Sequence, residues 1–145
     1  MVMWARGIVL SIALIAAVGS AADGRASLID VRVTGMQRVA EAQYADAKAL
    51  ASRGGNPLDI ALAVAGPFEG SMQHVVQVNE GAEAPSASRI TVLRDGLLDD
   101  SVRGERWDIA LERTAEGAWR VKEVKRAWRC RRGSQTGSFV ATRCP

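Results

Sequence analysis

The residues with the clearest potential for chemistry lie in one basic stretch near the end of the chain. Residues 125–132 read Lys-Arg-Ala-Trp-Arg-Cys-Arg-Arg. Arginine next to an aromatic ring can bind a phosphate, a carboxylate or a sugar phosphate through bidentate hydrogen bonds and stacking. The candidate ligand-binding residues are therefore Arg126, Trp128, Arg129, Arg131 and Arg132.

Internal pairing is the simpler interpretation of the same arginines. Residues 118–145 hold eight basic side chains and one acidic one, whereas residues 23–117 hold fifteen acidic and ten basic ones. Opposite charges on adjacent strands often pair, and Trp128 would then belong to the core. The acids within reach along the chain are Asp99, Asp100, Glu105, Asp108 and Glu112.

A second polar cluster is the acidic stretch Asp-Gly-Leu-Leu-Asp-Asp-Ser at residues 95–101. Three carboxylates and a hydroxyl could hold Ca²⁺ through hard oxygen ligands, but the spacing does not match an EF-hand loop. Turn and capping chemistry of Asp and Ser explains the stretch more simply. We therefore expect no metal site here.

Groups suited to catalysis are scarce. His74 is the single histidine, and it lies in an apolar strand pattern. The chain has no Gly-x-Ser-x-Gly elbow and no phosphate-loop or dinucleotide glycine pattern. We assign no catalytic residue and expect no cofactor. Acid–base work by Asp95, Asp99 or Asp100 would need a carboxylate from a distant part of the chain.

The first 22 residues have the organisation of a secretory signal peptide. Arg6 is the only charge, residues 7–18 carry none, and small residues follow at Ser20 and Ala22. We expect cleavage after Ala22, with cleavage after Ala21 as the near alternative. An uncleaved anchor is less favoured, because the apolar run is short for a hydrocarbon core of about 30 Å. The mature chain, residues 23–145, is then periplasmic or secreted and has no membrane span.

Export makes the cysteine pair informative. Cys130 and Cys144 are the only cysteines, and an even count in an exported chain favours a disulfide. The enclosed segment contains turn-forming residues such as Gly133 and Gly137. Closing a loop of this size stabilises a fold by about 3 kcal/mol in the chain-entropy model. A zinc site is disfavoured, because one histidine and two cysteines do not supply four ligands.

The first part of the mature chain is mainly helical in pattern. Residues 28–33 alternate and could form a short strand or a loosely paired tail. Thr34 and Gln37 have the spacing of a capping box, and the apolar periodicity behind them predicts a helix ending at Arg53 before two glycines. Asn56-Pro57 predicts a second helix over residues 58–65, although a strand fits that short apolar run nearly as well.

The remainder predicts strands over residues 72–78, 89–94, 102–113 and 119–130. Residues 79–88 form a polar connection, and residues 115–117 a hairpin turn. Trp119 and Val121 have the opposite parity to Val124 and Trp128, so we expect a β-bulge near Lys122 and Glu123.

The last third resembles a group of small exported bacterial proteins without an assigned function. The resembling positions are residues 94–97, 99–103, Trp119, 128–130, Gly133 and Cys144. This resemblance implies export and the pairing of the two cysteines. The order of elements, a leading helix followed by a long-stranded sheet, is similar to NTF2-like and cystatin-like architectures.

The sequence thus predicts a single α+β domain, with one or two N-terminal helices packed on an antiparallel sheet of four or five strands. Our leading hypothesis is a non-catalytic module that binds an anionic small molecule or envelope component; we expect no nucleic-acid partner. A second hypothesis is a small enzyme or a ligand-binding pocket in a curved, NTF2-like sheet, lined by Trp107 or Trp119 with an acid such as Asp108 inside. A third is an inhibitor or interaction module that uses a protruding disulfide loop, residues 131–143.

Export gives the first testable prediction. Because signal peptidase cleaves after small residues, protein recovered from the exported fraction should begin at Asp23. N-terminal sequencing measures this directly. A mature chain that still begins at Met1 would contradict the assignment.

Overall fold

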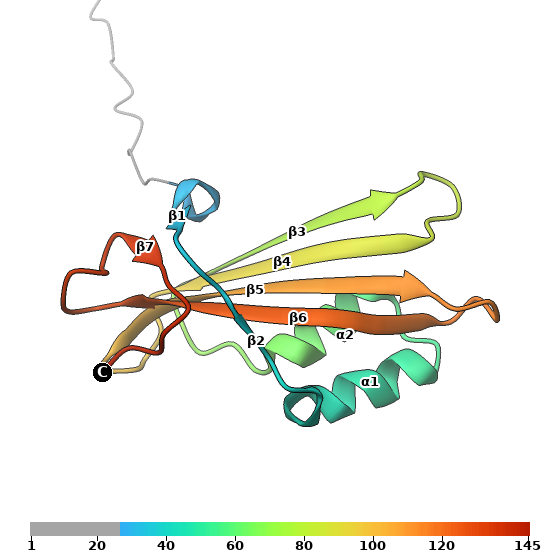
Figure 1. Ribbon diagram of the computed structural model, residues 1–145, viewed down its shortest axis with the longest axis horizontal. Helices are drawn as coiled ribbons and strands as arrows, with labels where there is room; N and C mark the ends of the chain where they lie inside the picture. Colours follow the sequence, from blue (N-terminus) through green and yellow to red (C-terminus); the bar gives the residue numbers. More distant parts are fainter. Residues whose placement is uncertain (1–26) are drawn as a thin grey trace, which may run out of the picture.

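The molecule is built around one antiparallel sheet. The computed structural model describes residues 27–145 (Figure 1), so the predicted signal peptide and its cleavage site lie outside the described residues. The sheet has the strand order β2-β6-β5-β4-β3. Its strands are β2 (Gln37–Arg38), β3 (Met72–Glu80), β4 (Ala87–Asp95), β5 (Val102–Arg113) and β6 (Trp119–Cys130). With two α-helices against this sheet, the α+β class and the final long hairpin are confirmed.

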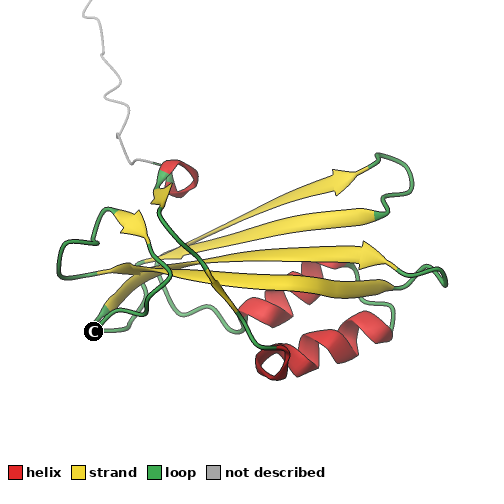
Figure 2. Ribbon diagram, viewed as in Figure 1, coloured by secondary structure: helices red, strands yellow, loops and turns green. Residues whose placement is uncertain are grey.

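Both α-helices cover the same face of the sheet (Figure 2). A 3₁₀ turn, η2 (Glu41–Tyr44), leads into α1 (Ala45–Ser52), which packs against β6. The second helix, α2 (Pro57–Ala65), packs against β4 and β5. Within residues 27–145, none of the helices is long and apolar enough to cross a membrane.

The N-terminal cap decides the structure of the second apolar run. Asn56 Oδ1 accepts a hydrogen bond from the Asp59 backbone N–H at 2.9 Å, and Pro57 occupies the first helical position. Both features favour a helix start. The Asn56 side chain accepts from a backbone N–H that has no partner within the helix, and Pro57 has no N–H that would need one. Residues 57–65 are therefore helical, which excludes the strand alternative.

Two apolar clusters hold the layers together. The larger lies between helices and sheet, where Ala47 and Ile60 from the helices meet Ile90 and Ile109 from the strands. Ala47 is completely buried, and its small side chain lets α1 approach the sheet closely. The smaller cluster joins Leu93 and Ala127, on the opposite face, to Leu28 and Phe139, with other side chains around them.

The predicted helix start at Thr34 is wrong. Residues 37–38 form β2, which pairs with Lys125 and Arg126 of β6, and the Val39 N–H donates to the Val124 carbonyl at 2.9 Å. The segment is extended because the outer edge of β6 has backbone groups that need partners. The α-helix begins only at Ala45, so the Thr34–Gln37 capping pattern does not correspond to a helix end.

The predicted bulge is confirmed. Ala110 faces Glu123 and Leu111 faces Val121, so Lys122 has no residue opposite it. The extra residue changes the parity of β6 and places Val121 and Val124 on the same, helix-covered face.

The ends of the described chain pair with each other on the far face. The sequence allowed a short strand over residues 28–33. In the structure these residues form a 3₁₀ turn, η1 (Leu28–Asp30), followed by the two-residue strand β1 (Arg32–Val33). β1 pairs in parallel with β7 (Ser138–Phe139). The predicted connection at residues 79–88 is shorter than expected, because β3 continues to Glu80 and β4 begins at Ala87.

The cap of α2 generates a stability prediction. Asn56→Ala removes the acceptor for the Asp59 N–H, so the free energy of unfolding should fall by about 1 kcal/mol. Asn56→Ser retains a capping oxygen and should stay within a few tenths of a kcal/mol of the native value. Urea unfolding of both variants tests this; equal losses for Ala and Ser would show that the cap is not the cause.

Candidate functional site

Arg126 and Trp128 lie next to each other on the helix-covered face of β6. The Arg126 guanidinium carbon is 4.3 Å from the centroid of the Trp107 ring and 5.1 Å from that of Trp128. Trp128 is buried, whereas a third of the Arg126 side chain is exposed. Two aromatic rings thus support a guanidinium that still reaches solvent.

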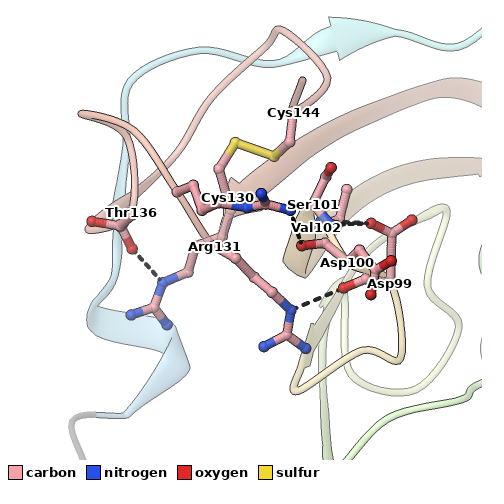
Figure 3. The surroundings of a disulfide bond; sticks show 10 residues. Asp99, Asp100, Ser101, Val102, Cys130, Arg131, Thr136 and Cys144 are labelled. Atoms are coloured by element: carbon pink, nitrogen blue, oxygen red, sulfur yellow. Dashed lines mark hydrogen bonds between the residues drawn. A yellow bond between two sulfur atoms is a disulfide. The ribbon is translucent and has the colours of Figure 1, made fainter.

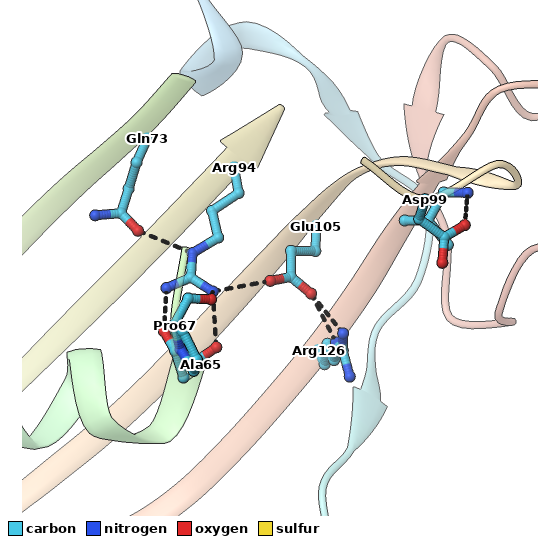
Figure 4. Close-up of polar contacts among 9 residues, drawn as sticks. Ala65, Pro67, Gln73, Arg94, Asp99, Glu105 and Arg126 are labelled. Carbon is cyan, nitrogen blue, oxygen red and sulfur yellow. Dashed lines mark hydrogen bonds and ion pairs between the residues drawn. The ribbon is translucent and has the colours of Figure 1, made fainter. Parts of the chain in front are cut away.

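Glu105 of β5 holds the Arg126 guanidinium in position. Its Oε2 accepts hydrogen bonds from both Nε and Nη2 of Arg126, while its Oε1 accepts from Arg94 Nη1 at 3.1 Å (Figure 4). Glu105 and Arg94 are buried, at 5% and 2% exposure. The three side chains form one ladder across β4, β5 and β6, which we name the Arg94–Glu105–Arg126 ladder.

Arg94 also donates hydrogen bonds to the carbonyl groups at the C-terminal end of helix α2. Its Nη1 donates to the carbonyl oxygens of Ala65 and Pro67, its Nη2 donates to the carbonyl of Gly66, and its Nε donates to Gln73 Oε1 (Figure 4). These carbonyls lie at the negative end of the helix dipole. The sheet, the C-terminus of α2 and the ladder therefore share one buried cation.

The charge of the ladder does not cancel. Two guanidinium groups share a single carboxylate, so the ladder carries a net positive charge. Within residues 27–145, Nη1 of Arg126 has no hydrogen-bond partner. A positive group with free N–H donors therefore faces outward at this point of the sheet.

A groove of about 330 Å³ opens beside Arg126. We call it the Arg126 groove; its polar and aromatic lining residues are Gln37, Arg38, Gln43, Arg126, Trp128 and Arg143. Gln37 comes from β2 and Gln43 from η2, the segment that the sequence predicted as a helix. None of the described residues that line the groove is acidic.

The disulfide brings Arg143 to this groove. Cys130 at the end of β6 and Cys144 are bonded, which confirms the predicted pair (Figure 3). The chain between them turns back, and Val140 pairs with Trp128 through two backbone hydrogen bonds of 2.9 Å. Arg143 is exposed, and among the described residues it forms no ion pair within 4.0 Å.

The other three predicted arginines lie elsewhere. Arg129 points to the opposite face, where Nε donates to the Thr136 carbonyl at 2.9 Å and Nη1 is 3.6 Å from Asp95 Oδ1. Arg131 donates to the Leu97 and Asp99 carbonyls, as Figure 3 shows for Asp99, and Arg132 donates to Asp100. These arginines hold loops by backbone contacts, so the five residues do not form one site.

The acidic stretch is a turn. Asp99 Oδ1 accepts hydrogen bonds from the N–H groups of Val102 and Ser101, which hold the pKa of Asp99 below its ordinary value. The ionised carboxylate therefore stabilises the turn at neutral pH, and this contribution is lost as the pH falls through the lowered pKa. Residues 27–145 contain no group of three or more potential metal-ligating side chains.

The structure does not bring together the residues of the predicted NTF2-like pocket, and it limits the predicted disulfide loop. Trp107 is buried against the helices, while Asp108 lies on the opposite face and accepts from Thr91 at 2.9 Å. Trp119 lines a separate hollow of about 380 Å³ beside α1. The disulfide loop protrudes only in its first half, because Phe139 and Val140 are buried. His74 is half-buried on β3.

Comparison with known proteins yields no relative. No family model, no curated protein and no solved structure matches the chain. The function of the groove must therefore be argued from its own chemistry.

Sequence reasoning missed Gln37, Gln43 and Arg143. The two glutamines were assigned to the predicted helix, so nothing connected them to β6. Arg143 carried a usable signal: it precedes Cys144, and pairing with Cys130 places it close to the end of β6.

The ladder predicts unequal roles for its arginines. Arg94→Met leaves Glu105 and three carbonyls without their buried donor, so the free energy of unfolding should fall by about 3–5 kcal/mol. Arg126→Met should cost clearly less, because Glu105 keeps Arg94. Urea unfolding measures both losses; an Arg126→Met loss as large as that of Arg94→Met would contradict the ladder as described.

Proposed function

We propose that the protein is an exported, non-catalytic binding module for a small anionic molecule or headgroup, which it holds in the Arg126 groove. The observation that carries the proposal is the lining: its described residues include three arginines and two glutamines and no acid. Arg38 is already paired with Glu123, so Arg126 and Arg143 are the cations that can receive an anion. The volume lies at the lower end of the range for small-molecule sites. A carboxylate or a phosphate with a flat or apolar part fits this chemistry best.

Each side of the groove supplies a distinct interaction. Arg126 offers N–H donors for a charge-assisted hydrogen bond, and its position is fixed by Glu105 and two indole rings. Gln37 and Gln43 add neutral donors and acceptors, and Arg143 adds a second cation, whose charge also acts on Asp99. The site is thus preorganised on one side and adjustable on the other, which reduces the ordering cost of binding.

A larger hollow on the opposite face of the sheet is a weaker candidate for an anion. It measures about 550 Å³ on the opposite face, over β3, β4, β5 and β6. Its cationic lining residues, Arg38, Arg89 and Lys122, are matched by an equal number of acids, Glu80, Glu112 and Glu123. Arg38 and Lys122 already form ion pairs with two of these acids. The net charge of its lining residues is therefore close to zero.

The export signal and the groove are linked through the disulfide. Residues 1–22 direct the chain to a compartment where cysteines oxidise, and the bond between Cys130 and Cys144 keeps Arg143 near β6. We therefore place the active form in the periplasm or outside the cell. Reduction of the bond should weaken anion binding, because Arg143 is then free to leave the groove.

Calorimetric titration tests the proposal with four probes: inorganic phosphate, pyrophosphate, citrate and phenyl phosphate. We expect at least one to bind, with an affinity that falls as salt is added. Arg143→Ala should weaken that binding about tenfold, because it removes one charge-assisted hydrogen bond worth roughly 1.5 kcal/mol.

The matched control is Arg132→Ala. Arg132 is also exposed and close to the disulfide, but it does not line the groove. Its replacement should leave the affinity within a factor of about two. No binding of any probe, or an equal loss in both variants, would overturn the proposal.

A further inference from the structure

The edge of the sheet away from the groove is the long strand β3. Among residues 27–145, β3 is the last strand in the order β2-β6-β5-β4-β3 and pairs only with β4 (Figure 1). All nine of its residues are exposed or half-exposed, including Val75 at 36% and Val78 at 63%. Its outer backbone groups therefore face solvent along the whole strand.

The composition of β3 is unusual for such an edge. Residues 72–79 contain no acidic residue, lysine, arginine or proline, whereas β4, β5 and β6 each carry several charges. Native proteins usually protect an open edge with charges, proline or short strands, because an uncharged edge pairs with other strands. The opposite edge follows this rule, since β2 has two residues and one is Arg38. Residues 72–79 of β3 lack all of these devices.

We propose that β3 pairs in antiparallel fashion with β3 of a second copy of this chain. A twofold axis perpendicular to the sheet at Val76 overlaps all nine residues. Cross-strand pairs in this register are Gln73 with Asn79, His74 with Val78, Val75 with Gln77, and Val76 with itself. The only charged residue, Glu80, lies opposite Met72, so no like charges meet.

A second copy fits this edge better than an unrelated charged segment. A partner strand with acids or bases would find no opposite charge over residues 72–79, while an identical strand covers Val75 and Val78 with uncharged neighbours. The pairing also leaves the proposed binding site free, because the Arg126 groove lies at the β2–β6 side of the sheet. This inference therefore stands independently of the proposed function.

Sedimentation equilibrium of the purified, disulfide-bonded protein tests the pairing. We expect a monomer–dimer equilibrium for the native chain. Gln77→Lys with Val78→Lys should weaken the dimer at least about tenfold, because two lysines at the edge oppose strand pairing. Both side chains are exposed, so the fold should persist. The control is Leu98→Lys, which replaces an apolar side chain that is 83% exposed and lies outside β3.

Hydrogen exchange of the native chain provides a second measurement that needs no variant. The amides of β3 that point away from β4 should become protected as the protein concentration rises. A native chain that stays monomeric up to roughly 1 mM overturns the proposal. A dimer that the lysine pair does not weaken, or that leaves the β3 amides unprotected, overturns it as well.

Discussion

The buried guanidinium of Arg94 is the interaction on which the arrangement of layers and groove depends. A cation at 2% exposure is tolerable only when its N–H donors are hydrogen-bonded and its charge is paired. Three carbonyls at the end of α2, Gln73 of β3 and Glu105 of β5 meet this requirement together. Because Glu105 is thereby fixed, it can orient Arg126, which is the side chain that reaches the groove.

The C-terminal disulfide positions the second arginine of the groove. The ladder places one arginine at the groove from the sheet, and the bond from Cys130 to Cys144 places Arg143 there from the end of the chain. Between them, Val140 continues the pairing of β6 at Trp128. The groove thus combines a side chain held in the core with one held by a covalent bond that forms in an oxidising compartment.

The parts of the fold that were predictable from sequence are those fixed by local patterns. Asn56 and Pro57 identify a helix start by their own chemistry, and the change in parity between Val121 and Val124 can be accommodated only by an extra residue in β6. β5 alternates from Glu105 to Glu112, long enough for the period to be unambiguous, and β6 alternates with one change of parity at its bulge. The cysteine pair followed from the even number of cysteines and from the predicted export.

The parts that were not predictable depend on contacts between distant segments. The Thr34–Gln37 pattern resembles a helix cap locally, but the backbone groups at the edge of β6 keep these residues extended. The basic stretch was a candidate for one binding site, with internal pairing as the simpler interpretation. Alternation along β6 sends Arg126 and Arg129 to opposite faces, and Arg126 pairs with Glu105. The partnership of Glu105 with Arg94 could not be inferred either, because it involves the end of a helix whose place in the fold was unknown.

The central claim, that the Arg126 groove receives an anion, is tested most directly by nuclear magnetic resonance. Titration with the tightest of the four probes should shift the Trp128 indole N–H, the Arg126 Nε–H and the side-chain amides of Gln37 and Gln43. The backbone amides of residues 131–136 should remain unchanged. Shifts confined to residues 129–136, with the groove signals unmoved, would contradict the account.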